Sequence, residues 1–328
     1  MCCKMSIRYY TLIVLFLLFS QLISAQRTEN VINFDDNRNH ILLDVENDLL
    51  FQSDQYYTAG VALAYTFEDL KKTPAQFILR SKDAENYTFS GFGIEHRMFT
   101  PFSITDPYAI ENDRPYSAYF LLTNYSVLIN PKRNLKISNE LGIGLIGPAA
   151  GGEAIQTTVH EIIGSDLPIG WENQIANAFL IDYQFRIEKG FFTPWIAEHI
   201  IPFGMARIGT LKDEVNLGLM IKFGNKNKVL SSSFDLSENR DKFIWEFIFE
   251  ARLQGVFYDA TLQGGVFNGS EIVSLQIQDT FMRQYHIRTG INLYYKSFFL
   301  RYMVQLNSAD FTAGIVHRYG GVNIGFSF

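Results

Sequence analysis

Apolar residues alternate with small or polar residues over several long stretches of this chain. The last stretch shows it most clearly, with apolar residues at positions 322, 324, 326 and 328 and Asn, Gly and Ser between them. Residues 61–68 and 135–145 follow the same rule, and in the second of these only Asn139 is out of phase. Period two over about ten residues is typical of β-barrel strands that face lipid on one side and a lumen on the other. The pattern therefore predicts membrane-spanning strands.

The predicted strands are enough to close a barrel. Candidates lie near residues 40–50, 57–67, 87–99, 116–129, 133–146, 176–189, 191–209, 213–224, 242–257, 258–267 with 271–283, 284–296, 298–307 and 313–328. Bacterial single-chain barrels favour even strand numbers, so we expect about twelve. The predicted fold is an all-β, antiparallel transmembrane β-barrel with a short helical segment in one connection.

Composition supports a barrel over a helical membrane protein. The chain is 47% hydrophobic and contains 29 Phe and 17 Tyr. Beyond its first residues no apolar run approaches the roughly 18 to 20 residues that a membrane helix needs. A soluble β-sandwich is the alternative, but Phe328 closes an alternating strand, as in the C-terminal signature by which outer-membrane barrels are recognised for insertion.

The N-terminus has the layout of a secretory signal. Lys4 and Arg8 precede the apolar run of residues 12–19, and Ser24-Ala25 supplies the small residues of a cleavage site. We therefore expect residues 1–25 to be a signal peptide and residues 26–328 to form one outer-membrane domain of a Gram-negative bacterium. Both cysteines precede the apolar run, so the mature chain would have no disulfide or thiolate. A net charge of −6 with dispersed basic residues argues against nucleic acid as a partner.

One long connection carries residues that a barrel does not need. Gly147-Pro148 ends a strand, Ala and Glu residues then favour a short helix, and Gly164 suits the end of that helix. Gln156 and His160 are four residues apart, so they share one helical face, where an amide could hold or position an imidazole or its water. The alternative is a helix that merely covers a barrel end, with an exposed histidine.

The first strand ends in a second polar segment. If residues 41, 43 and 45 face lipid, Asp44, Glu46 and Asp48 face the lumen, and Asn47 points outward unless the strand ends or bulges there. Thr58 is in phase with the inward residues of the next strand. Carboxylate and amide oxygens grouped at a strand end suit Ca²⁺, although Asn-Asp there is also ordinary turn chemistry.

Several motifs, taken in order, give the chain a family resemblance. It resembles the LpxR-type outer-membrane lipid A deacylases from about residue 40 to the end. The motifs are Glu46-Asn47-Asp48, Tyr57-Thr58-Ala59-Gly60, Asp113-Arg114-Pro115-Tyr116-Ser117-Ala118, Gly147-Pro148 with Gln156 and His160, Gly170-Trp171 with Gln174, and Tyr258-Asp259-Ala260-Thr261-Leu262-Gln263-Gly264. The resemblance implies a twelve-stranded barrel that removes the 3′-linked acyloxyacyl chain of lipid A, a lipopolysaccharide component, in the outer leaflet, with Ca²⁺ as cofactor and no protein partner beyond the insertion machinery.

The resemblance also implies roles for individual residues. His160 would be the general base, Gln156 its neighbour on the helix, and Thr58 a supporting hydroxyl. Asn47 and Asp48 would be the calcium or oxyanion-side groups. The chemistry is sound by itself, because a neutral imidazole can take the proton of an attacking water and a divalent cation can stabilise the charge that develops on the ester oxygen.

Other basic and aromatic residues are open to two interpretations. Arg114 is a candidate for binding the phosphates of lipid A, or it is a structural residue paired with Asp113 or Glu111. Trp171 is a residue of the site or, as we interpret it, of the aromatic belt at the membrane interface.

Two competing functions remain. An outer-membrane phospholipase would also be a barrel using Ca²⁺ and His, but that family uses a Ser nucleophile in a His-x-Ser-Asn-Gly context, which this chain lacks. A porin-like barrel without catalysis would tolerate replacement of His160 and Asp48.

Overall fold

A computed structural model describes most of the chain from residue 39 onward. The described residues are 39–48, 51, 53–67, 70, 72–80, 85–108, 111–193, 197–225, 242–267, 275, 280 and 282–328. The expected signal peptide, residues 1–25, lies outside them.

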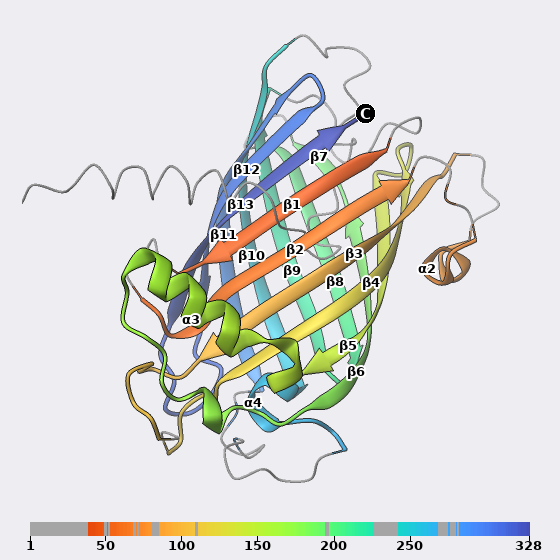
Figure 1. Cartoon of the computed structure of the whole chain (residues 1–328). Coiled ribbons are helices and arrows are strands. Elements are labelled where there is room, and N and C mark those ends of the chain that lie inside the picture. The colour runs from red at the N-terminus through yellow and green to blue at the C-terminus, as the bar shows by residue number, and fades with distance from the viewer. Residues whose placement is uncertain are drawn as a thin grey trace, which may run out of the picture.

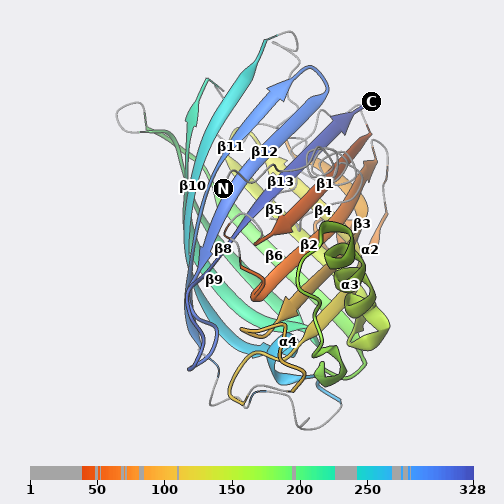
Figure 2. The same ribbon diagram turned by 60° about the vertical axis from the view of Figure 1, so that its left-hand side comes forward.

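The strands form one closed antiparallel barrel (Figures 1 and 2). The described residues contain β1 (His40–Asn47), β2 (Tyr56–Phe67), β3 (Tyr87–Thr100), β4 (Ser117–Asn130), β5 (Leu135–Ile146), β6 (Ala178–Lys189), β7 (Phe191–Thr193), β8 (Ala197–Gly209), β9 (Lys212–Gly224), β10 (Ile244–Asp259), β11 (Arg283–Tyr295), β12 (Phe298–Asn307) and β13 (His317–Ser327). Of these thirteen strands, the three-residue β7 pairs only with β8. The other twelve close the wall, because β1 pairs with β13 and β6 pairs with β8. The predicted barrel is confirmed.

Alternation along the strands separates lipid-facing from lumen-facing residues, as predicted. Exposed apolar side chains such as Leu217, Leu253 and Ile181 cover the outside of the wall. Glu46, which the pattern directs inward, is buried, accepts a hydrogen bond from Tyr57 Oη and pairs with Arg97.

One predicted strand is wrong. Of the candidate strand at 258–267 with 271–283, only Tyr258 and Asp259 are extended, as the end of β10, and the helix α4 (Ala260–Gln263) follows them. Most of residues 271–283 lie outside the described part of the chain. The Asp259 side chain caps α4 by accepting a hydrogen bond from Thr261 N at 2.9 Å. Asp is a preferred N-cap residue, so Asp259 is a local signal for the start of a helix. The apolar residues around it also fit a strand, and that pattern led to the wrong prediction.

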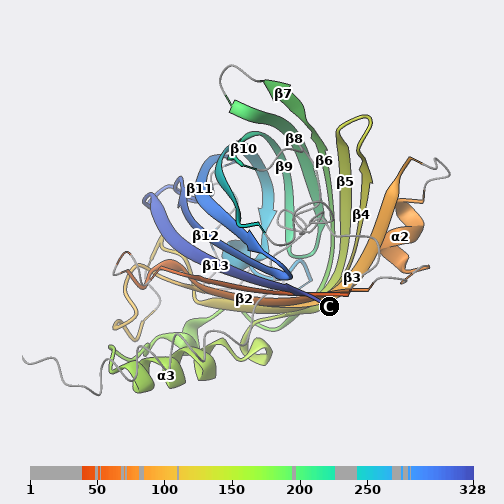
Figure 3. The same cartoon turned by 90° about the horizontal axis from the view of Figure 1, so that it is seen from above.

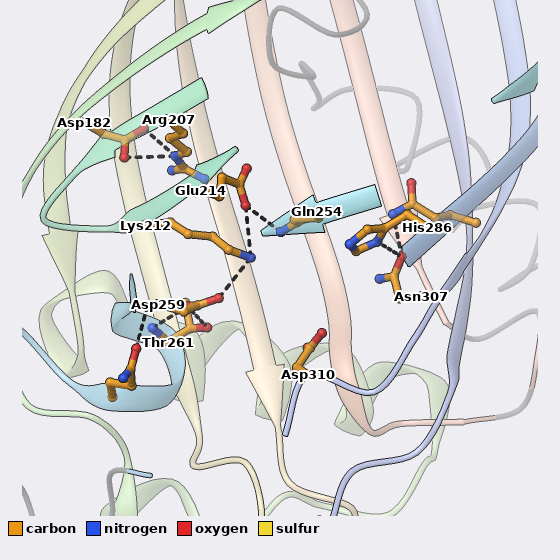
Figure 4. A network of polar contacts seen from close by, with 12 residues as sticks. Asp182, Arg207, Lys212, Glu214, Gln254, Asp259, Thr261, His286, Asn307 and Asp310 are labelled. Carbon is orange, nitrogen blue, oxygen red and sulfur yellow. Dashed lines mark hydrogen bonds and ion pairs between the residues drawn. The ribbon is translucent and has the colours of Figure 1, made fainter. Parts of the chain in front are cut away.

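Charged side chains cross the lumen in pairs (Figure 4). Arg207 Nε lies 2.9 and 2.7 Å from the two carboxylate oxygens of Asp182. Lys212 Nζ lies 3.1 Å from Asp259 Oδ2 and 3.4 Å from Glu214 Oε2. All of these side chains are mostly buried, and each charge has an opposite charge as its neighbour. A buried charge needs such a partner because little water is available to solvate it.

Two helices lie outside the barrel (Figure 3). The helix α3 (Gly152–Ile163) follows the short 3₁₀ helix η3 (Pro148–Ala150), and η4 (Trp171–Asn173) comes after it. The helix α2 (Pro74–Ile78) belongs to the connection between β2 and β3 and lies beside β3 and β4, whereas α3 belongs to the connection between β5 and β6 and lies against another part of the outer wall (Figure 1). No helix in the described part of the chain is long and apolar enough to cross a membrane.

Candidate active site

The helix α3 is held against the outside of the wall by local features that its sequence supplies. Gly164 adopts φ 72°, a left-handed conformation that suits glycine, and its N–H bonds to His160 O, which ends the helix. A Cβ atom at Gly152 would lie 2.5 Å from Ala118 Cβ and 2.6 Å from the Trp171 ring. A glycine at this position therefore lets the helix approach β4 closely.

Gln156 and His160 lie on the same, wall-facing side of α3 and meet a carboxylate there. The carboxylate belongs to Asp54, in the connection between β1 and β2. His160 Nε2 lies 3.0 Å from Asp54 Oδ2, and Gln156 Nε2 donates to Asp54 Oδ1 at 3.0 Å. Thr58 Oγ1 donates to the same Oδ1 at 3.2 Å. We call Asp54, Thr58, Gln156 and His160 the outer cluster; three of the four were predicted from sequence.

Trp171 fixes the orientation of Gln156. Its Nε1 donates to Gln156 Oε1 at 2.8 Å, and an indole N–H can only donate. The amide oxygen of Gln156 must therefore face Trp171 and its NH₂ group must face Asp54. Trp171 is 1% exposed, so the interpretation as a belt residue is wrong. The loop after α3 folds back over β4, and the indole packs on Tyr116 with ring centroids 4.8 Å apart.

The imidazole of His160 is held at both nitrogens. Nδ1 lies 2.5 Å from Asp166 O, so this nitrogen carries a proton and donates it to the carbonyl. The hydrogen bond with Asp54 is the main reason that the pKa of His160 is raised above its ordinary value, while partial burial acts in the opposite direction. The side chain of Asp54 keeps 26% of its surface exposed, so this contact lies at the open side of the cluster.

Asp48 and Asn47 lie beside the outer cluster. Asp48 Oδ2 accepts hydrogen bonds from Ser53 Oγ at 3.0 Å and from Gln55 N at 3.1 Å. Burial, and secondarily the nearby Asp54 carboxylate, raise the pKa of Asp48 to about 8. The expected lumen orientation of Asp48 does not hold, because β1 ends at Asn47 and alternation stops there.

The side chains near Asp48 carry oxygen atoms of the kind that bind a hard cation. Two carboxylates that repel one another, with amide and backbone oxygens around them, are the ligands that Ca²⁺ takes. Within the described residues no three acidic or histidine side chains converge on one point, so backbone, water or substrate oxygens would have to complete a calcium shell. Asn47 Nδ2 donates to Thr58 O at 3.0 Å, which fixes the amide at the strand end.

A β-bulge determines the direction of Thr58. The pairing of β2 with β3 shifts register between Tyr57 and Ala59, so Thr58 is the extra residue. Its hydroxyl therefore lies with Asp54 and with Thr100 Oγ1, at 2.8 Å, on the outer side rather than in the lumen. The predicted inward direction was wrong, because period two fails at a bulge.

Arg114 lies on the other side of the wall from the outer cluster. Its side chain is buried among the residues that line a lumen cavity of about 170 Å³. Nη2 pairs with Asp310 Oδ2 at 2.9 Å and Nη1 donates to Thr261 Oγ1 at 3.0 Å. The structure therefore does not bring Arg114 to the outer cluster, and the ion pair that holds it is with Asp310 rather than with Asp113 or Glu111.

Asp54 is the residue of the cluster that sequence reasoning missed. It lies in an irregular connection without periodicity, between the two polar segments that were singled out. In the sequence it is one more acidic residue in a loop, six residues after Asp48. Its role becomes visible only through its contacts with Gln156 and His160 of α3. Only its position between two motif segments could have drawn attention to it.

Comparisons with known proteins bear on both the fold and the family. A family model described as "Outer membrane protein LpxR" matches residues 12–328. Among solved structures, LpxR from Salmonella typhimurium is 21% identical, with 88% of this chain and 100% of that chain covered and a TM-score of 0.71. The β domain of the Bordetella autotransporter BrkA is 8% identical, with 89% and 98% covered and a TM-score of 0.42. No curated protein matches the chain. The Salmonella structure shares the fold of this chain.

Proposed function

Because the chain belongs to the LpxR family of outer-membrane proteins, we propose that it is an ester hydrolase that removes the 3′-linked acyloxyacyl chain of lipid A. The observation that carries this proposal is the outer cluster, in which a histidine, a carboxylate, an amide and a hydroxyl meet on the lipid-facing side of a barrel wall. A lipid in the same membrane would reach the cluster at Asp54, whose side chain keeps 26% of its surface exposed.

The surroundings of the cluster suit an amphipathic substrate. Ile155 and Ile162 on the far side of α3 are 42% and 55% exposed, and Leu167 and Ile169 in the following loop are 44% and 50% exposed. A helix with one polar side on the wall and apolar residues on the other is stable at a membrane interface. The polar head of a lipid would meet the cluster while its chains stayed in hydrocarbon.

The chemistry that we propose begins at the contact between Asp54 and His160. A water molecule inserted there can donate one proton to His160 Nε2 and the other to Asp54. As the water oxygen attacks the ester carbonyl, Nε2 takes its proton, while Nδ1 continues to donate to Asp166 O. The resulting imidazolium is stabilised by Asp54, and it can return the proton to the departing alkoxide. No covalent enzyme intermediate is needed.

Gln156 and Thr58 act on this step through Asp54. Both donate to Asp54 Oδ1, which leaves Oδ2 directed at His160. They are positioning residues in this proposal, and Trp171 in turn positions Gln156.

We propose Ca²⁺ as the cofactor, as the family resemblance implies. Asp48 and Asn47 would hold it, since their side chains carry hard oxygen donors at the end of β1. A bound calcium ion would supply electrostatic stabilisation for the negative charge that develops on the ester oxygen. The corresponding expectation is that chelation abolishes activity and that Asp48→Ala raises the calcium requirement.

The first test is mass spectrometry of lipid A from an outer-membrane-competent host that expresses the wild-type chain, His160→Ala or Glu161→Ala. Glu161 is exposed on the same helix, so it is the matched control. We expect loss of one 3′ acyloxyacyl unit with wild type and Glu161→Ala, and a roughly 10²- to 10⁴-fold slower reaction with His160→Ala.

Two outcomes would contradict the proposal. Full activity of a folded His160→Ala protein would remove His160 from the mechanism. Unchanged lipid A with the wild-type barrel in the membrane and calcium supplied would reject the activity; hydrolysis of phospholipid would then favour a phospholipase, and no hydrolysis a barrel without catalysis.

A further inference from the structure

The helix α2 covers a polar part of the outer wall that hydrocarbon could not cover. Asn124 on β4 and Asn139 on β5 are both buried, although they lie on the faces that point Leu122 and Ile143 outward. Asn124 Oδ1 accepts from Ala75 N at 2.9 Å, and Asn139 Nδ2 donates to Ala75 O at 3.0 Å. Asn139 is the one residue that broke the alternation of its strand, and α2 explains it.

The two asparagines must be paired wherever lipid surrounds the barrel. A polar group without a hydrogen-bond partner in hydrocarbon is strongly unfavourable. The backbone of α2 supplies partners at Ala75, which is 0% exposed. Thr73 Oγ1 caps the helix by accepting a hydrogen bond from Gln76 N, so this N–H group in the first turn of α2 also has a partner within the segment. The backbone of α2 is thus hydrogen-bonded to the wall through both the N–H and the carbonyl of Ala75.

The other side of α2 is apolar and open. Phe77 is 75% exposed and Ile78 is 49% exposed. Lys72 and Arg80, at the two ends of the segment, are also exposed. Apolar residues between basic ones match the boundary between hydrocarbon and lipid headgroups, where long basic side chains reach the phosphates.

We propose that α2 is a membrane-contact element whose partner is phospholipid. Phe77 and Ile78 lie in the hydrocarbon, and Lys72 and Arg80 contact phosphates. The surface is continuous with the lipid-facing wall, because β3 and β4, on which α2 packs, also expose Phe92 and Leu122.

Contact with lipid does not depend on the proposed function, because it follows from the place of α2 against β4 and β5 on the outer wall.

The test uses the full chain with Cys2→Ser and Cys3→Ser, so that one introduced cysteine carries a spin label. Labels at Phe77→Cys, Leu122→Cys and Tyr108→Cys are compared in vesicles of phosphatidylethanolamine and phosphatidylglycerol. Leu122 lies on the wall, and Tyr108 is 78% exposed in a connection at the α3 end. Collisions with oxygen, which prefers the bilayer, and with a water-soluble nickel chelate report the surroundings of each label.

We expect the label at position 77 to match the one at 122, with frequent oxygen collisions and few collisions with nickel. A label at 77 that collides with nickel as often as the one at 108 would overturn the proposal. Ile78→Cys repeats the measurement if Phe77→Cys does not insert. Deacylation measured on the same samples separates the two proposals. An active protein with a water-exposed label would refute only the membrane contact of α2. An inactive protein with a lipid-exposed label would refute only the proposed deacylase function.

Discussion

At the scale of single residues, the outer cluster depends on which atoms face one another. Asp54 receives three side-chain donors, so it sets the protonation of His160 and the positions of Gln156 and Thr58. Asp54 raises the pKa of the His160 imidazole, and the direction of this shift can be tested. A raised pKa means that His160 keeps its proton to a higher pH, and a general base must first lose that proton.

Asp54→Asn should therefore shift the pH profile of hydrolysis. With wild type, activity should be lost as pH falls through a His160 pKa that lies above 6.5. Without the carboxylate the imidazole loses its proton at a lower pH, so the acid limb should move down while the maximal rate falls. Rates of lipid A deacylation from pH 4 to 9 would show this, and an acid limb at the same pH in both proteins would exclude His160 as the titrating base.

Trp171→Phe should affect the rate through Gln156. The variant keeps an aromatic ring but leaves the buried Gln156 Oε1 without its donor, a loss of about 1–3 kcal/mol, or roughly five- to 150-fold if it all appears in the rate. We expect kcat to fall with KM little changed. Tyr116→Phe, which removes a hydroxyl directed at Ile104 O instead, is the control and should stay near wild-type activity.

At the scale of elements, the site exists because a helix lies against a strand. The approach of α3 to β4 is limited by what stands at position 152. Strand periodicity does not predict this contact, because Gly152 and Ala118 are 34 positions apart in the chain.

Gly152→Val should separate α3 from the wall. The new side chain would have to displace Ala118 or the Trp171 ring, at a cost of about 1–3 kcal/mol, and Gln156 and His160 would move away from Asp54. We expect a folded barrel with little deacylase activity. Ala154→Val, exposed on the same helix, adds the same β-branched side chain without the collision and should remain active. Equal losses in both variants would mean that the effect comes from helix propensity instead.

At the scale of the whole molecule, stability is concentrated in the wall and its lumen. The ion pair of Asp182 and Arg207 is buried, whereas that of Lys132 and Glu85 is exposed at a connection. Loss of one partner leaves a buried charge uncompensated in the first case and a solvated charge in the second.

Asp182→Ala should lower the temperature at which the folded barrel loses its compact mobility on a gel. The expected destabilisation is roughly 3–5 kcal/mol, because the Arg207 guanidinium would keep no carboxylate partner. Lys132→Ala should leave this temperature unchanged. A barrel equally stable in both variants would show that water enters the lumen freely around Arg207.

The sequence by itself determined the barrel, since strands that face lipid on one side must alternate and a helix face repeats every three to four residues. It placed Gln156 and His160 on one helical side and ended that helix at Gly164, because both are local properties of the chain. Only the tertiary structure decided that this side meets the outside of the wall, that a bulge turns Thr58 outward, and that Asp54 joins them. It also directed Arg114 into the lumen. Those outcomes depend on contacts between distant segments, which periodicity and local capping do not encode.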